Sequence, residues 1–200
     1  MTNQTVRSDD LELASRCAQG DSRAQRELFA DYRARVHGTL YRILGSNRDM
    51  EDLVQDAFFE VFRSLGSFRG DAMLSTWISR ITTRVAFAYI SRRKPAVSSL
   101  DAVPEQATDD PSAERHAFAR EAARRLYGVL DRVEPKQRIA FTLHAMMGLP
   151  MAEVADITDS SIVAIKSRVW RARREVNRRA RKDPLLATFL RGDEPFREEE

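Results

Sequence analysis

The strongest constraint on the fold is the spacing of apolar residues, which recur every three or four positions along almost the whole chain. The clearest case is the segment 49–66, where they form a single line: Met50, Leu53, Val54, Ala57, Phe58, Val61, Phe62 and Leu65. This period places apolar side chains on one face of an α-helix. No stretch of any length shows the two-residue alternation of a β-strand, so the sequence predicts an all-α fold.

Breaks in the pattern divide the chain into two helical halves. Residues 95–116 contain three prolines, carry a cluster of acidic side chains and show no helical period, which is typical of an irregular linker. We therefore expect two small helical domains, 8–94 and 117–182, joined by an acidic flexible linker at 95–116 and followed by an acidic tail at 183–200. The expected helices cover about 9–20, 21–45, 49–66, 73–92, 117–131, 134–147, 151–157 and 161–181.

Charge is concentrated in blocks, although the formal net charge of the chain is only +3. Residues 160–182 carry nine basic side chains and one acidic side chain, whereas 96–117 and the last 18 residues each carry a net charge of −4. Arginine accounts for 29 of the 33 basic residues, and its planar set of donors suits phosphates and guanine edges. This distribution indicates a polyanionic partner for the C-terminal half.

The C-terminal half has the proportions of a helix-turn-helix, with a short helix at 151–157, a turn at 158–160 and a long basic helix. Such a unit places its second helix in the major groove of DNA. We expect an apolar line to face the core: Ile162, Ile165, Val169, Ala172 and Val176. The outer face then carries Ser161, Lys166, Ser167, Trp170, Arg171 and Arg174. A merely solvated basic helix is the less favoured alternative, because a net charge of +8 exceeds what solubility needs.

The N-terminal half carries two further candidate surfaces. The polar side of the third helix holds the acidic or amide residues Asp49, Glu51, Asp52, Gln55, Asp56 and Glu60. Clustered carboxylates can bind a divalent metal or act as an acid/base pair, but without a histidine a solvated or protein-docking face is favoured. The fourth helix carries Trp77, Arg80, Arg84 and Phe87 about one turn apart, which suits single-stranded nucleic acid, although Trp77 alone is more typical of a core residue.

Several classes of function are disfavoured by what the sequence lacks. His37, His116 and His144 are far apart, the single cysteine Cys17 has no activating neighbour, and no phosphate-binding glycine motif or nucleophile motif is present. We expect no catalytic residues, no metal site, no cofactor and no small-molecule substrate. The first residues have no apolar core of a signal peptide, and no stretch approaches 18 apolar residues, so we expect a cytoplasmic protein without membrane insertion.

Two long strings resemble one known family. The string DMEDLVQDAFFEVFRSLGSFRGDAMLSTWISRI at 49–81 resembles region 2 of sigma-70 factors of the extracytoplasmic-function class. The string LPMAEVADITDSSIVAIKSRVWRARREV at 149–176 resembles region 4 of the same family. The resemblance covers about 10–182 and implies a non-enzymatic sigma factor that binds bacterial core RNA polymerase and promoter DNA. An anti-sigma factor is a further implied partner.

The resemblance also implies roles for individual residues. Asp52, Gln55, Asp56 and, less directly, Glu60 would dock on core polymerase. The −10 element would be read or held by Phe68, Arg69, Gly70, Ser75, Thr76, Trp77, Arg80 and Arg84. The −35 element would be read by Ser161, Lys166, Ser167, Arg168, Trp170, Arg171 and Arg174. One departure is Val163-Ala164, where the class commonly has a Gly-Thr or Gly-Ser pair, so base preference does not carry over from relatives.

Two alternatives make different predictions. A stand-alone helix-turn-helix regulator would bind a specific duplex without polymerase. A metal-dependent nucleic-acid enzyme built on the 49–60 carboxylates would show magnesium-dependent activity that is lost on Asp52→Asn and Asp56→Asn.

Overall fold

The computed structural model describes residues 2–45, 48–92 and 111–187, and within these ranges every regular element is helical. The N-terminal half contains α1 (Thr2–Ala18), α2 (Ser22–Leu44), α3 (Met50–Ser64), the short 3-10 turn η1 (Leu65–Ser67) and α4 (Leu74–Arg92). The C-terminal half contains α5 (Pro111–Leu130), α6 (Pro135–Phe141), the π-helical turn η2 (Thr142–Met146), α7 (Met151–Ile157) and α8 (Ile162–Ala180). The all-α prediction is confirmed.

Side-chain hydrogen bonds define the starts of three helices. Asp21 caps α2, its carboxylate accepting hydrogen bonds from the backbone N–H groups of Arg23 and Ala24. Glu134 caps α6 in the same way, with Pro135 at the first helical position. Asp10 on α1 accepts from the N–H of Leu74 at 2.9 Å, which ties the start of α4 to the first helix.

The linker prediction needs one correction at its C-terminal end. Helix α5 begins at Pro111, six residues before the expected start at 117, so the last residues of the predicted linker are helical. Proline is well suited to a first helical turn, because its missing N–H is not needed there. Residues 95–110 of the predicted linker lie outside the described residues, as does the predicted tail beyond 187.

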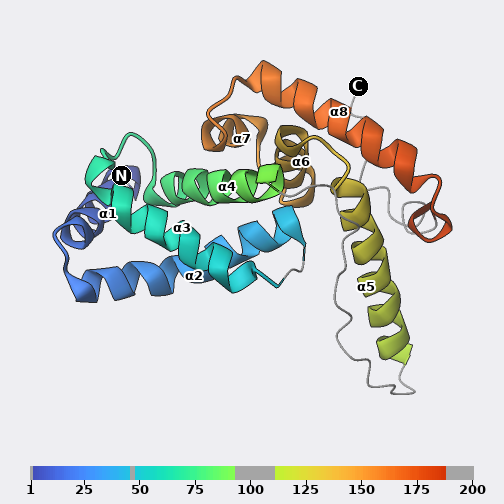
Figure 1. The fold of residues 1–200 in the computed structure, drawn as a ribbon. Helices are drawn as coiled ribbons and strands as arrows, with labels where there is room; N and C mark the ends of the chain where they lie inside the picture. Colours follow the sequence, from blue (N-terminus) through green and yellow to red (C-terminus); the bar gives the residue numbers. More distant parts are fainter. Residues whose placement is uncertain (1, 46–47, 93–110, 188–200) are drawn as a thin grey trace.

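The two halves are docked against each other rather than held apart. Figure 1 shows α4 lying between the α2–α3 pair on one side and α6 and α7 on the other. One continuous apolar core joins Leu28, Leu40 and Ile78 of the N-terminal half to Ile139 and Val154 of the C-terminal half. The two halves therefore share one hydrophobic core across their boundary.

This docking changes which face of α4 is buried. Val85 and Tyr89 continue the spacing of apolar residues that begins at Leu74 and Ile78, yet these two side chains are only half-buried. The fully buried set extends instead to Thr82, Thr83 and Ala86, because the C-terminal half covers that side of the helix. The hydroxyl of Thr82 donates to the carbonyl of Ile78 at 2.9 Å, which makes its burial tolerable.

The start of the predicted tail packs onto the C-terminal half. Leu186 is buried in a small cluster with Ala122 of α5 and Ala180 of α8. Asp183 accepts a hydrogen bond from Arg125 at 3.0 Å and from the backbone N–H groups of Leu185 and Leu186. Residues 183–187 therefore close the end of the α5–α8 pair.

Candidate nucleic-acid and polymerase interface

Helices α7 and α8, with the turn Thr158-Asp159-Ser160 between them, form the predicted helix-turn-helix. Ser161 caps α8, its hydroxyl oxygen accepting from the N–H of Ala164 at 3.2 Å. Asp159 adopts a left-handed backbone with φ of 49°, which reverses the chain within three residues. A buried line holds α8 against the domain: Ile165, Val169, Ala172, Val176 and Ala180. Ile162, which the sequence assigned to this line, is instead 45% exposed because it lies in the first turn beyond the core.

Most of the predicted −35 residues lie on one open face of α8. Lys166, Arg171 and Arg174 are exposed, and Trp170 is 59% exposed. The guanidinium carbon of Arg174 lies 5.5 Å from the centroid of the Trp170 ring, a cation–π contact that fixes both side chains. This face offers a stacked ring and several cations to a ligand.

Two residues of the predicted −35 set are placed differently. Arg168 is half-buried and its Nη1 donates to the hydroxyl of Ser160 at 2.7 Å, so its guanidinium points toward the turn. Ser167 is half-buried at the edge of the outer face. Arg168 thus fixes the geometry of the helix-turn-helix in this arrangement.

The predicted polymerase-docking residues lie together on the open side of α3. Asp52, Gln55 and Asp56 are exposed, whereas Glu60 is half-buried and bridged to Arg63 at 2.5 Å. Phe59, which sequence reasoning did not select, is 65% exposed between these polar residues. It borders a groove of about 650 Å³ between α3 and α4, whose apolar lining includes Leu53, Ile81 and Val85. Phe59 could have been found from the sequence only because it is an aromatic residue on the otherwise polar side of the helix.

The predicted −10 residues lie on the loop before α4 and along that helix. The rings of Phe68 and Trp77 pack against each other with centroids 5.5 Å apart, and both are half-buried against the core. Arg69 is exposed beside them, and Ser75, Thr76 and Arg80 are half-buried. Gly70 has a φ of 74°, and a β-carbon there would lie 3.1 Å from the Leu11 side chain, so this loop position requires glycine.

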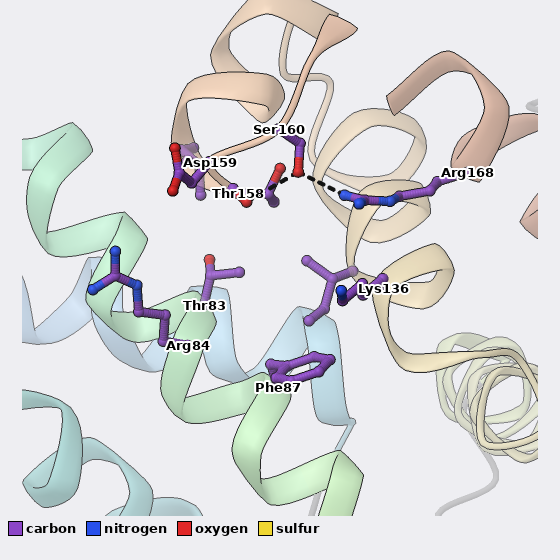
Figure 2. Close-up of a pocket in the computed structure, with 10 residues that line it drawn as sticks. Thr83, Arg84, Phe87, Lys136, Thr158, Asp159, Ser160 and Arg168 are labelled. Atoms are coloured by element: carbon purple, nitrogen blue, oxygen red, sulfur yellow. Dashed lines mark hydrogen bonds between the residues drawn. The ribbon is translucent and has the colours of Figure 1, made fainter. Parts of the chain in front are cut away.

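A small cavity lies at the boundary between the halves. Its volume is about 230 Å³, and Thr83, Arg84 and Phe87 of α4 line one side (Figure 2). The opposite side holds Lys136 of α6, the turn residues and Arg168. One −10 candidate, Arg84, and one −35 candidate, Arg168, therefore border the same small space.

The C-terminal end of α2 is capped by side chains from the other half. The hydroxyl of Tyr127 donates to the carbonyls of Tyr41 and Arg42, at 3.2 and 3.1 Å. Arg138, only 2% exposed, donates from Nε to the carbonyl of Ile43 at 2.8 Å and from Nη2 to that of Leu44 at 3.2 Å. The N–H of Gly45 also donates to the carbonyl of Tyr41 at 2.8 Å, so each of the last four carbonyls of α2 has a donor, and those of Arg42, Ile43 and Leu44 are satisfied from the other half.

Further contacts support this cap. Nη1 of Arg138 donates to Asp131 at 2.5 Å, so the buried guanidinium has a counter-charge. Burial raises the pKa of Tyr127 to about 12. Gly45, with φ of 79°, lets the Tyr127 ring lie directly on the backbone, where a β-carbon would come within 2.8 Å of the ring.

The residue types that most often act in catalysis lie in this structure where they pack or bond to the backbone. Burial raises the pKa of the Cys17 thiol, which lies in the core. His144 Nδ1 lies 2.8 Å from the carbonyl of Leu149, next to the start of the helix-turn-helix. Within the described ranges, no three histidine, cysteine or acidic side chains come close enough to hold a metal ion. In the same ranges no helix has the length and apolarity needed to cross a membrane.

Comparison with known proteins matches both halves to one family. The model of sigma-70 region 2 matches residues 28–95, and that of sigma-70 region 4 matches residues 123–176. The ECF RNA polymerase sigma-E factor of Escherichia coli (strain K12) is 30% identical over 186 residues, covering 88% of this chain and 96% of the relative. The corresponding factor of Haemophilus influenzae is 28% identical, with 88% and 97% covered.

Solved structures share the fold. The chain superposes on CnrH, solved with the cytosolic domain of CnrY, with a TM-score of 0.62, 22% identity and coverage of 87% of this chain and 98% of that one. The sigma factor RpoE of Bartonella quintana, solved with the anti-sigma factor NepR, gives a TM-score of 0.55, 20% identity and coverage of 79% and 97%. Two family regions in the expected order on two docked helical domains make this chain a member of the sigma-70 family. Its similarity over nearly its whole length to sigma-E factors places it, more narrowly, among the extracytoplasmic-function sigma factors.

Proposed function

We propose that this protein binds core RNA polymerase and directs it to promoters, with one DNA-reading surface on each half. The observation that carries the proposal is the open basic and aromatic face of α8, the second helix of a helix-turn-helix, in a chain of the sigma-70 family. Cations on such a helix bind phosphates, and their hydrogen-bond donors read base edges in the major groove. We assign recognition of the −35 element, as duplex DNA, to this face of α8.

The N-terminal half takes the other roles. We assign core-polymerase docking to Asp52, Gln55 and Asp56, with Glu60 at the edge, because these polar side chains share the open side of α3. Exposed Phe59 adds an aromatic anchor of the kind that dominates binding energy at protein interfaces. We assign binding of the −10 element, which the family resemblance implies, to the loop before α4 and to the basic residues of α4. Arg69 in the loop and Arg84 on the helix are both exposed. Arginine beside aromatic rings suits a melted single strand.

The docked arrangement must open for both elements to be read at once. Elements centred at −10 and −35 are roughly 25 base pairs apart, which is about 85 Å along B-form DNA. In the docked structure Arg84 of α4 and the turn before α8 instead border one cavity of about 230 Å³, so the two halves lie far closer together than that separation. We therefore assign the docked structure to the free factor, and an arrangement with separated domains to the promoter complex.

The domain limits, partners and location follow from the same proposal. We assign region 2 to 8–94, a linker to 95–116 whose end is continuous with α5, region 4 to 117–182 and a tail to 183–200. The factor acts in the cytoplasm, where its polymerase and promoters lie, and contributes no catalytic centre of its own. An anti-sigma factor is a further proposed partner, because the sigma factor RpoE of Bartonella quintana, which shares the fold, was solved with the anti-sigma factor NepR.

Run-off transcription tests the proposal. Purified bacterial core polymerase, this protein and a library of upstream fragments from its own genome should yield discrete start sites that neither protein gives alone. The variant Asp52→Arg should abolish them, because it reverses an exposed charge on the proposed docking face. The control Glu12→Arg reverses an exposed charge on α1 and should leave the start sites unchanged.

Two results would overturn the proposal. If no transcripts form while the protein alone binds specific duplex fragments, the chain is a stand-alone regulator. If Asp52→Arg and Glu12→Arg initiate equally well, the open side of α3 is not the polymerase-docking surface.

A further inference from the structure

The first turn of α8 presents two apolar side chains to solvent. Val163 is 77% exposed, the largest exposed fraction among the large apolar side chains that the structure describes, and Ile162 is 45% exposed. On a helix of 3.6 residues per turn, Val163 lies opposite the buried line of Ile165, Val169 and Ala172. It shares its face with Trp170 and Arg174, and therefore lies on the outer face of the helix.

The position of these side chains limits what they can contact. In a helix-turn-helix, the N-terminal residues of the second helix are the ones that reach base edges in the major groove. The groove offers one apolar feature at those edges, the C5-methyl group of thymine. A branched aliphatic side chain such as valine can bury that methyl group and gains nothing from hydrogen-bonding groups elsewhere on the bases.

The polar side chains at the same end of the helix form hydrogen bonds within the protein. The hydroxyl of Ser161 accepts the capping hydrogen bond from Ala164, and Arg168 donates to Ser160 in the turn. The exposed cations Lys166, Arg171 and Arg174 lie further along the helix. The start of α8 therefore reads by apolar contact, and the later turns supply the charge.

We infer that Val163, with Ile162 beside it, reads the C5-methyl group of thymine in the upstream duplex element, so that a T·A pair faces the start of α8. This inference rests on the proposed function, because it assigns a base preference to the surface that reads the −35 element. It also gives a role to the Val163-Ala164 pair, which replaces the Gly-Thr or Gly-Ser pair common in the class. Duplex DNA, and not a protein, is the occupant because the face around these residues is strongly basic.

Single methyl groups in the promoter test the inference directly. Holoenzyme formed from core polymerase and the full chain is assayed on a promoter obtained from the run-off library. Each thymine of the −35 element, on both strands, is replaced in turn by deoxyuridine, which lacks only the C5-methyl group. At one or two positions the substitution should lower the initiation rate about fourfold, the factor expected for one buried methyl group.

A variant then assigns the effect to a side chain. In Val163→Ser the thymine and deoxyuridine promoters should initiate equally at that position, because the partner of the methyl group is gone. Substitution at so exposed a site leaves the fold intact. The matched control Phe118→Ser removes an exposed apolar side chain from α5 and should retain the fourfold difference.

The outcomes separate this inference from the proposed function. Start sites that are insensitive to deoxyuridine at every −35 position, or a −35 element without a T·A pair, overturn the inference alone. A deoxyuridine effect that persists unchanged in Val163→Ser also overturns it, since the methyl group is then read by another residue or through DNA shape. Failure to obtain any start site overturns the proposed function, and with it the inference.

Discussion

The variant Arg138→Met should open the boundary between the two halves. Arg138 makes three hydrogen bonds, but only those to the carbonyls of Ile43 and Leu44 cross the boundary. The third joins it to Asp131 within the C-terminal half, and this pair persists when the halves separate. Methionine keeps a side chain of similar length to the aliphatic stem of arginine while removing every hydrogen-bond donor.

The magnitude follows from those two contacts. A hydrogen bond to a charged group contributes about 1.5–3 kcal/mol, and loss of the donor leaves both carbonyls buried without a partner in the docked state. In the open state, water satisfies the same carbonyls. Taking about 3 kcal/mol for the pair, the ratio of docked to open molecules should fall more than a hundredfold.

Distance measurements between spin labels check this expectation. Labels at exposed Ala30 and Ala152, in a Cys17→Ser background, report on the two halves without touching the boundary. The wild-type protein should give one narrow, short distance distribution, and Arg138→Met a broad, longer one at unchanged helix content. The control Arg132→Met removes an exposed arginine nearby and should keep the narrow distribution.

Binding to core polymerase gives a second readout. If only the open form binds, a factor that is mostly docked binds more weakly in proportion to its open fraction. Arg138→Met should then bind core polymerase more tightly than the wild type. An affinity for core polymerase and a distance distribution that both stay at the wild-type values would refute the reasoning, because a hundredfold larger open fraction must raise the affinity even when most molecules remain docked.

Three other predictions concern single features of the structure. Replacing Phe59 with Ser should weaken core-polymerase binding at least tenfold, as measured by titration, while Phe118→Ser should not change it, because only Phe59 lies among the residues proposed to dock on polymerase. Gly45→Ala should loosen the docked state in the spin-label assay, since its β-carbon would come within 2.8 Å of the Tyr127 ring at a left-handed φ; an intact narrow distribution would contradict this. Glu121 and Glu175, each bound by two arginines, have pKa values of about 2, below the ordinary 4.5. Their contribution to stability is present above pH 4.5 and is lost as the pH falls toward 2, so E121Q/E175Q should be less stable than wild type by about 1 kcal/mol at pH 6 in urea unfolding, with the gap closing below pH 3.

The helices and the DNA-binding unit could be predicted because their signals are local. Asp21 lies one residue before α2 and caps it, as its place in the sequence indicates. The apolar line of α3, spaced at three and four, is buried almost as predicted, with Phe62 only half-buried. The turn between α7 and α8 and the basic composition of α8 could also be identified within one short segment. In each case the residues that cause the structure are within a few positions of the structure they cause.

The docking of the halves could not be predicted, since its contacts join distant segments. Arg138 is one of 29 arginines in the sequence, and its partners Ile43 and Leu44 lie 95 and 94 residues away. The burial of Thr83 and Ala86 depends on the same docking, because a periodicity argument identifies only the apolar face of α4. The exposure of Val163 and Ile162 depends on where the core ends beneath the first turn of α8, which the apolar pattern alone assigned wrongly for Ile162.

The chemistry of the boundary explains why docking can be firm and still reversible. The groups capped by Arg138 and Tyr127 are the terminal carbonyls of α2, which carry partial negative charge and attract a cation. When the halves part, water replaces both donors at those carbonyls, and Asp131 still holds Arg138. No charge is left buried and unpaired in either state, so the polar groups of the boundary oppose opening only weakly, and the main cost of opening is the exposure of apolar residues that the halves share, such as Ile78 and Ile139. A partner that binds only the open form, as core polymerase does in this proposal, shifts the population toward that form and is bound more weakly in proportion to the docked fraction.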